Sequence, residues 1–215
     1  MKMGQWLIGV LPVMAVCCWI YIWMRENGQR KRGLPAKCGV TWLVVCTAVI
    51  GLTSGGIYPL RSLIFWALLL FLAADALLEL YFAAGLLAFG GGHLMLMLWL
   101  FGQETPAAAS LVIWLVIVGL VAMGFWPEMA SCRREKKKLL VFLYPAAVAA
   151  MVSAAVVLPA NHGMHYLPAA VGAVLFAVSD YILGKRHFRG ISVRLDRAAL
   201  VLYYLGILMI ALAAG

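Results

Sequence analysis

Long apolar runs recur along the entire chain, and they constrain the fold more than any other feature of the sequence. Each run holds close to 20 residues, which as a helix rising about 1.5 Å per residue would cross a hydrocarbon core about 30 Å thick. Apolar residues make up 66% of the 215 residues and charged residues 12%, whereas soluble domains contain roughly 45–50% apolar residues. The sequence therefore predicts a polytopic helical membrane protein and excludes a soluble fold.

The runs between charged or glycine- and proline-rich breaks predict eight transmembrane helices. They lie near residues 6–24, 38–53, 61–80, 82–101, 107–126, 139–158, 167–184 and 198–214. The shortest break, Glu79–Leu80–Tyr81, separates the third span from the fourth. Because the spans use most of the chain, we expect one all-α integral membrane domain over residues 1–215, an eight-helix bundle with no separate soluble domain.

Basic residues are concentrated in three breaks that follow odd-numbered spans. The segments 25–37, 127–138 and 185–197 each hold five Lys or Arg residues, and the other breaks carry only Lys2 and Arg61. The positive-inside rule places these three breaks in the cytoplasm and both termini outside. The basic excess is thus a topology signal rather than a sign of nucleic-acid binding, and we expect a multi-pass protein of a bacterial inner membrane. The N-terminal run has no small-x-small cleavage site, so we expect it to be retained as the first helix.

Four ionisable residues lie inside predicted spans, namely Asp75, Glu79, His93 and Asp180. Each requires an explanation, because an Asp at the centre of a span costs about 2.5–3.5 kcal/mol on insertion scales. Asp75 and Asp180 lie at similar distances from the cytoplasmic ends of the third and seventh spans, which predicts that both carboxylates sit at one depth. Glu79 follows Asp75 by one helical turn and shares its face. His93 lies near the middle of the membrane.

Apart from Arg61 at the outer end of the third span, no Lys or Arg falls within the predicted spans to neutralise these acids; Lys37 stands at the cytoplasmic mouth of the second span. Two buried carboxylates without a cation are expected to share a proton, which would provide a general acid beside a general base. The alternative is a cationic ligand, such as a choline or ethanolamine headgroup held against aromatic faces. At least one of Tyr203 and Tyr204 in the eighth span can reach the depth of the two aspartates in the membrane.

The surroundings of the two aspartates resemble each other. Residues 70–78 and 175–183 share the pattern L-F-x-x-x-D-x-x-L, and each Asp is followed ten positions later by a glycine, Gly85 or Gly190. Because the third and seventh spans run in the same direction, the pattern suggests a parallel pseudo-repeat of two four-helix halves.

At these positions the sequence resembles the YhhN family of lysoplasmalogenase-like membrane proteins, over roughly residues 35–212. The family's fourth-span pattern appears as Phe82, Gly85, Phe89 and His93. Its seventh-span signature G-x-L-L-F-x-x-S-D-x-x-L appears over residues 172–183, with Val174 in place of the first Leu. Further matches are the third-span acid Asp75, the sixth-span pair Tyr144 and Met151, and the final tyrosines Tyr203 and Tyr204.

The resemblance implies hydrolysis of the vinyl-ether bond of a lysoplasmalogen, which yields a fatty aldehyde and glycerophosphocholine or glycerophosphoethanolamine. One of Asp75 and Asp180 would protonate the enol ether, and the other would stabilise the cation and activate water. Lys37 would meet the phosphate, with Arg197 as a further candidate. The supporting or substrate-binding residues are expected to be His93, Lys37, Glu79, Ser179, Tyr203, Tyr204 and Tyr144. The reaction needs an acid, a base and water, so no metal or cofactor is expected. The partners are a lysophospholipid entering from the inner leaflet and the surrounding membrane lipids.

Two other functions remain open from the residues alone. Acids within a membrane and a parallel repeat are also typical of a proton-coupled transporter, and a non-catalytic lipid-binding protein is the third possibility. The backbone before His93 is left uncovered by three glycines, Gly90, Gly91 and Gly92. Such an uncovered backbone is suited either to helix packing or to the approach of a ligand. The pair His162 and His165 has no carboxylate or cysteine nearby, so we interpret it as part of a loop rather than a metal site. The five cysteines show no CxxC spacing, and structural disulfides are not expected.

Overall fold

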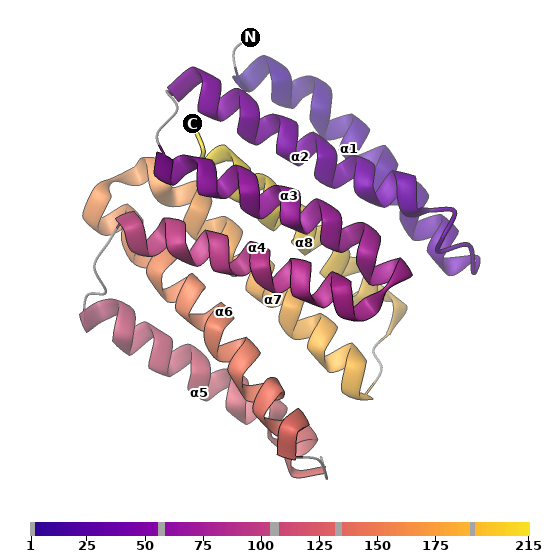
Figure 1. The fold of residues 1–215 in the computed structure, drawn as a ribbon, viewed down its shortest axis with the longest axis vertical. Coiled ribbons are helices and arrows are strands. Elements are labelled where there is room, and N and C mark those ends of the chain that lie inside the picture. The colour runs from indigo at the N-terminus through magenta and orange to yellow at the C-terminus, as the bar shows by residue number, and fades with distance from the viewer. Residues whose placement is uncertain (1–2, 56–58, 104–107, 132–134, 190–191) are drawn as a thin grey trace. The chain divides into compact units, whose positions relative to one another are not determined.

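The computed structural model describes residues 3–55, 59–103, 108–131, 135–189 and 192–215, and these residues form an all-helical fold (Figure 1). Within them lie eight α-helices: α1 Met3–Glu26, α2 Leu34–Gly55, α3 Pro59–Leu80, α4 Phe82–Gln103, α5 Ala108–Ser131, α6 Glu135–His162, α7 Leu167–Arg189 and α8 Val193–Leu212. A short 3-10 turn, η1 Met164–Tyr166, precedes α7. Each α-helix contains a segment long and apolar enough to cross a membrane, which confirms the predicted number of spans.

Most helices are longer than the apolar runs that predicted them, because helical hydrogen bonding continues where the side chains become polar. The second helix starts at Leu34 rather than near residue 38, so Lys37 lies in its first turn. The expectation that no Lys or Arg other than Arg61 falls within a span is therefore wrong. The break between α3 and α4 lies where the sequence placed it, at Tyr81, whose N–H donates to the Leu77 carbonyl at 2.6 Å.

The described chain groups into two compact units. The first unit comprises Met1–Trp99 and Ile207–Gly215, and the second comprises Leu100–Gly206. Asp75 belongs to the first unit and Asp180 to the second, and each unit is described by itself below. The common depth of the two aspartates and the four-plus-four pseudo-repeat stay predictions.

In the first unit, α2 packs between α1 and α3, and Figure 1 shows these helices side by side at the indigo and violet end of the colour scale. The Trp6 indole donates to the Thr47 hydroxyl at 2.9 Å and ties α1 to α2. Ile64 and Phe71 of α3 and Val40 and Val44 of α2 are completely buried. The apolar faces of α2 and α3 thus form a core. This core holds in place the polar residues near one end of the two helices.

The connection from α1 to α2 begins with a Schellman turn. The N–H of Gln29 donates to the Met24 carbonyl at 2.8 Å, and the N–H of Gly28 donates to the Arg25 carbonyl at 3.2 Å. Gly28 has a φ of 74°, a left-handed conformation that glycine adopts without steric cost. The turn ends α1 sharply and directs the following residues, including Arg30, back across the end of the helix.

Glycines allow α3 and α4 to approach each other closely. A Cβ atom on Gly85 would collide with the backbone of Leu78, and one on Gly92 would collide with the Phe71 ring. At Gly91 a Cβ would be in ordinary contact with Leu70. Of the two explanations left open for these glycines, helix packing accounts for Gly92, whereas a side chain at Gly91 would be accommodated.

In the second unit, α6 packs between α5 and α7. The Trp114 indole on α5 donates to the Ala146 carbonyl on α6 at 2.9 Å. Many large side chains on α5 are exposed, among them Met123, which is 67% exposed. An apolar side chain exposed on a helix of this length is suited to lipid rather than water.

Candidate active site

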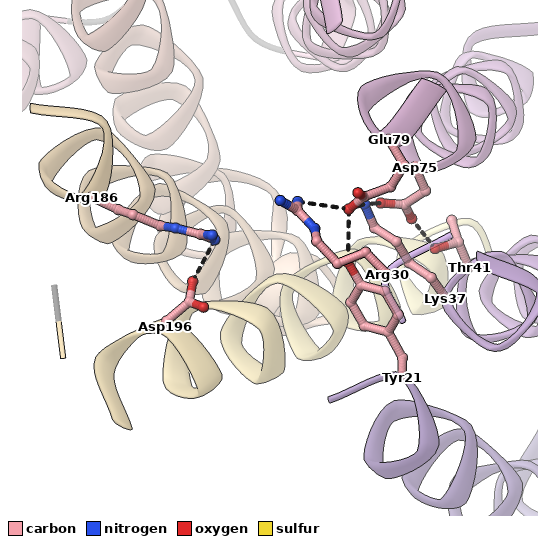
Figure 2. A network of polar contacts seen from close by, with 8 residues as sticks. All are labelled: Tyr21, Arg30, Lys37, Thr41, Asp75, Glu79, Arg186 and Asp196. Atoms are coloured by element: carbon pink, nitrogen blue, oxygen red, sulfur yellow. Dashed lines mark hydrogen bonds and ion pairs between the residues drawn. The ribbon is translucent and has the colours of Figure 1, made fainter. Parts of the chain in front are cut away.

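A buried set of charged and polar side chains lies where α2 meets α3 in the first unit (Figure 2). We call it the Lys37 cluster; its members are Tyr21, Arg30, Lys37, Thr41, Asp75 and Glu79. The Lys37 ammonium lies 3.5 Å from Oδ1 of Asp75 and 3.5 Å from Oε1 of Glu79. These three side chains are each at most 8% exposed. The arrangement places one lysine between two acids, one helical turn apart on α3.

Both carboxylate oxygens of Asp75 have a partner from α2. Lys37 contacts Oδ1, and the Thr41 hydroxyl donates to Oδ2 at 2.5 Å. Thr41 follows Lys37 by four residues, so both side chains leave the same face of the helix. A nearby cation and a hydrogen-bond donor both stabilise the ionised form of a carboxyl group. The geometry is therefore suited to an ionised Asp75.

Three donors converge on one oxygen of Glu79. The Tyr21 hydroxyl donates to Oε1 at 2.8 Å, Arg30 Nη2 lies 3.1 Å away and Lys37 Nζ lies 3.5 Å away. The Arg30 side chain is 50% exposed, whereas that of Glu79 is 7% exposed. Partial burial by itself would lower the pKa of the Arg30 guanidinium. The Glu79 carboxylate has the larger effect in the other direction and raises this pKa above its usual value.

The cluster changes the electrostatic expectation for Asp75 and Glu79. Their charges are balanced within the protein by Lys37 and Arg30, so neither a shared proton nor a cationic ligand is needed for neutrality. The cation was missed because Lys37 lies just before the apolar run that marked the second span. A span predicted from hydropathy ends where the polar residues begin, although the helix continues through them.

Asp180 has a different partner. In the second unit the Tyr144 hydroxyl on α6 donates to Oδ2 of Asp180 on α7 at 2.5 Å. Asp180 is 9% exposed. Tyr144, which the resemblance alone selected, is thus in direct contact with the predicted catalytic aspartate of α7. The prediction that Asp180 and Asp75 face one chamber stays a prediction.

The other predicted residues of the second unit have packing contacts. The Ser179 hydroxyl is completely buried and donates to the Ala199 carbonyl at 2.8 Å, which joins α7 to α8. Tyr203 packs against Phe176 with ring centres 5.5 Å apart and against Tyr204 at 5.2 Å. Both tyrosines are at most 5% exposed. Ser179 therefore positions the helix that carries Asp180, and the tyrosines line the α7–α8 contact.

His93 lies in an aromatic environment in the first unit. Its ring packs edge-on against Phe89 and Phe71, with ring centres 4.9 and 5.4 Å away. Nδ1 lies 2.9 Å from the Phe89 carbonyl, which can only accept, so this nitrogen carries the proton. His93 is 5% exposed. Phe71 lies one turn before Asp75 on α3, so the histidine packs next to the helix that carries the two acids.

Near the α7–α8 connection, Arg186 and Asp196 form an ion pair at 2.8 Å (Figure 2). The exposed fraction of the Arg186 side chain is 38%. The Asp196 side chain is 15% exposed, so the pair is part-buried. The described residues contain no group of three or more His, Cys, Asp or Glu positioned to hold a metal ion, and this covers His162 and His165. Cys132 and Gly190 lie outside the described residues.

Three members of the Lys37 cluster were not predicted from the sequence, namely Tyr21, Arg30 and Thr41. Thr41 carried a usable signal, because it lies one turn after Lys37 on the same helical face. Tyr21 and Arg30 carried none, because their partner Glu79 lies 58 and 49 residues away in sequence. Only the packing of α1 and α3 on either side of α2 brings them together.

The family of the chain follows from how much of the sequence matches a family model. A model of the YhhN family matches residues 12–214, nearly the whole chain. The chain belongs to the YhhN family. No curated protein and no solved structure matches it. This YhhN protein is therefore a polytopic membrane protein whose eight helices contain a buried cation–diacid cluster in one unit and a tyrosine–aspartate pair in the other.

Proposed function

We propose that this YhhN protein hydrolyses the vinyl-ether bond of lysoplasmalogens and releases a fatty aldehyde and a glycerophosphocholine or glycerophosphoethanolamine. The reaction comes from the resemblance to the family, and the observation that supports it is the ion pair between Lys37 and Asp75, which keeps a carboxylate ionised inside an apolar helix pair. A buried carboxylate of fixed charge is suited both to stabilising a developing cation and to accepting a proton from water.

The pairing supports one assignment of the roles that the sequence left open. Because Asp75 is held as a carboxylate, Asp180 takes the part of the acid. It gives a proton to the β-carbon of the vinyl ether, which converts the neighbouring C–O unit into an oxocarbenium ion. Water then adds to this carbon and passes its extra proton to Asp75, which forms a hemiacetal. This mechanism depends on the prediction from the sequence that Asp75 and Asp180 face one chamber.

Collapse of the hemiacetal returns both groups to their starting states. The C–O bond to glycerol breaks, Asp75 passes its proton to the glycerol oxygen, and the hemiacetal hydroxyl returns a proton to Asp180 as the aldehyde forms. The net change is the addition of one water molecule. Tyr144 donates to Asp180 in the resting protein and would orient that carboxyl group during the transfer.

The proposal includes the orientation taken from the basic segments. Both termini lie outside, and the Lys37 cluster opens toward the cytoplasmic leaflet of a bacterial inner membrane, from which the lysolipid enters with its chain between helices. Labelling of single cysteines introduced at Lys31 and Ser54 tests this orientation in intact cells. A membrane-impermeant reagent should modify the cysteine that replaces Ser54, which lies at the opposite end of α2, and spare the one that replaces Lys31. The reverse pattern would contradict the orientation.

The decisive experiment incubates a lysoplasmalogen with detergent-purified protein and measures products by mass spectrometry. Appearance of aldehyde and the glycerophospho-headgroup supports the hydrolase. Binding without product would indicate a lipid-binding protein, and uptake into proteoliposomes without product would indicate a transporter. Either of these results would overturn the proposal. Asp196→Asn, which alters the part-buried pair with Arg186, is the matched control for effects of removing a carboxylate charge.

A further inference from the structure

Arg30 differs from the rest of the Lys37 cluster in its exposure. Half of its side chain is open to solvent, whereas the Glu79 side chain that it contacts is 7% exposed. Its guanidinium contacts Glu79 through Nη2, and a guanidinium carries five N–H donors in a planar fork. Arg30 therefore keeps donors for a second anion while it holds the first.

Lys37 is poorly placed to bind an anion from outside, although the sequence suggested it for that task. Its ammonium is within 3.5 Å of both Asp75 and Glu79, and its side chain is 8% exposed. A buried cation shared by two carboxylates would leave them unbalanced if it moved to a third anion, which is costly in a medium of low dielectric constant. The anion-binding role therefore falls to the more exposed Arg30.

The surrounding segment favours an anion at this place. Residues 25–37 contain five basic residues and a single acidic one, Glu26. Together with Asp75 and Glu79 the acids number three, so the basic residues remain in excess. Lys31 and Arg32 follow Arg30 directly and are exposed. The positive charge that is not balanced within the cluster thus lies on the same short connection as Arg30.

We propose that Arg30 binds the phosphate of a single-chain phospholipid through N–H groups that do not contact Glu79, and that the charge of Glu79 weakens this binding by repelling the phosphate. This inference rests on the proposed function, because the ligand is the headgroup of the same lysolipid. Arginine binds phosphate through two parallel N–H bonds, which lysine cannot reproduce. Asp75 lies one helical turn beyond Glu79, about 5.4 Å along α3. The glycerol backbone between the phosphate and the vinyl ether would extend along this turn and bring the vinyl ether to Asp75.

The test measures binding to the full chain in a zwitterionic detergent. The probes are a non-cleavable 1-O-alkyl lysophosphocholine and the matching 1-O-alkylglycerol, which lacks the phosphate. Arg30→Gln should weaken binding of the lysophosphocholine about tenfold, which corresponds to about 1.4 kcal/mol. It should leave binding of the alkylglycerol unchanged. Arg32→Gln, which removes the same charge two residues away, is the matched control and should bind both probes as the wild type does.

Glu79→Gln separates phosphate binding from a merely structural role of Arg30. The variant keeps the shape of the side chain but removes the repelling charge, so it should bind the lysophosphocholine as tightly as the wild type or more tightly. If Arg30 acts only by holding Glu79 in place, Glu79→Gln should lose as much affinity as Arg30→Gln. That result would overturn the inference, as would wild-type affinity in Arg30→Gln. If Arg30→Gln does not fold, Arg30→Lys serves in its place and should show a smaller loss of the same kind.

The phosphate could also come from a bilayer lipid, and competition distinguishes the two sources. An excess of two-chain phosphatidylglycerol that displaced the lysophosphocholine from the wild type, but not from Arg30→Gln, would assign the site to bilayer lipid and overturn the inference. Failure of the proposed function gives a different result. If no aldehyde forms but lysophosphocholine binding still depends on Arg30, the hydrolase proposal fails and the phosphate site stands.

Discussion

Asp75 and Asp180 look alike in the sequence, each late in a long apolar helix, but their surroundings differ. Asp75 contacts a lysine and accepts from a threonine, whereas Asp180 accepts from a tyrosine. A lysine beside a carboxylate fixes its charge, whereas a phenol is neutral and can either donate or accept. The comparison teaches that two aspartates in similar sequence patterns can lie in different electrostatic surroundings, one beside a cation and the other beside a neutral donor.

The largest expected effect comes from removing either carboxylate. Asp75→Asn and Asp180→Asn should each lower aldehyde release by about 10²–10⁴-fold, because each group transfers a proton in the reaction. Groups that act in one step are not additive, so the double variant should be little worse than the more damaging single variant. Initial rates measured by mass spectrometry check this, with Asp196→Asn as the control. Activity retained in either purified single variant would remove that residue from the mechanism.

Lys37→Met should affect stability more than any change near Asp180. Removing one member of a buried ion pair costs about 3–5 kcal/mol, because the remaining charges lose their counterion. Thermal unfolding in detergent should show a large fall in melting temperature. Combining Lys37→Met with Asp75→Asn should recover part of the loss, since fewer carboxylates are then left unbalanced. Lys31→Met, an exposed change on the preceding connection, is the control. A Lys37→Met variant as stable as the wild type would mean that the ion pair is not formed.

Thr41→Val and Tyr144→Phe remove corresponding hydrogen bonds from the two aspartates. Thr41→Val should destabilise the protein by about 1.5–3 kcal/mol, the usual contribution of a hydrogen bond to a charged group, and Tyr144→Phe by about 0.5–1.5 kcal/mol, that of a bond between neutral groups. Their effects on turnover should differ. Lys37 still holds Asp75 ionised without Thr41, whereas Asp180 loses the donor that orients it without Tyr144. Tyr144→Phe should therefore lower the rate more than Thr41→Val at equal folded protein. Equal losses of rate would contradict the difference in roles.

Ser179→Ala should have the smallest effect. The hydroxyl donates to a backbone carbonyl of α8, so its loss should cost about 1 kcal/mol of stability. Aldehyde release should fall only in proportion to the folded fraction, measured by thermal unfolding and initial rates on the same samples. A loss of activity without a loss of stability would instead place Ser179 in contact with the substrate, as the resemblance first implied.

The sequence predicted the candidate site unevenly. Asp75, Glu79, His93 and Asp180 were found because a polar residue in an apolar run is conspicuous whatever its neighbours are. The ion pair of Lys37 was not found, because the lysine lies in polar sequence before the run and its partners lie on another helix. The contact of Arg30 with Glu79 also depends on the turn at Gly28, which sends the chain back across the end of α1.

By itself the sequence determined the eight helices, the break at Tyr81 and the family, because hydropathy and short motifs are properties of neighbouring residues. Only the tertiary structure decided which charges meet. The close approach of α1, α2 and α3 sets Lys37 between Asp75 and Glu79 and brings Tyr21 and Arg30 to the same carboxylate. Ion pairs form between side chains that are near in space. The distance between two side chains in space cannot be read from their separation along the chain.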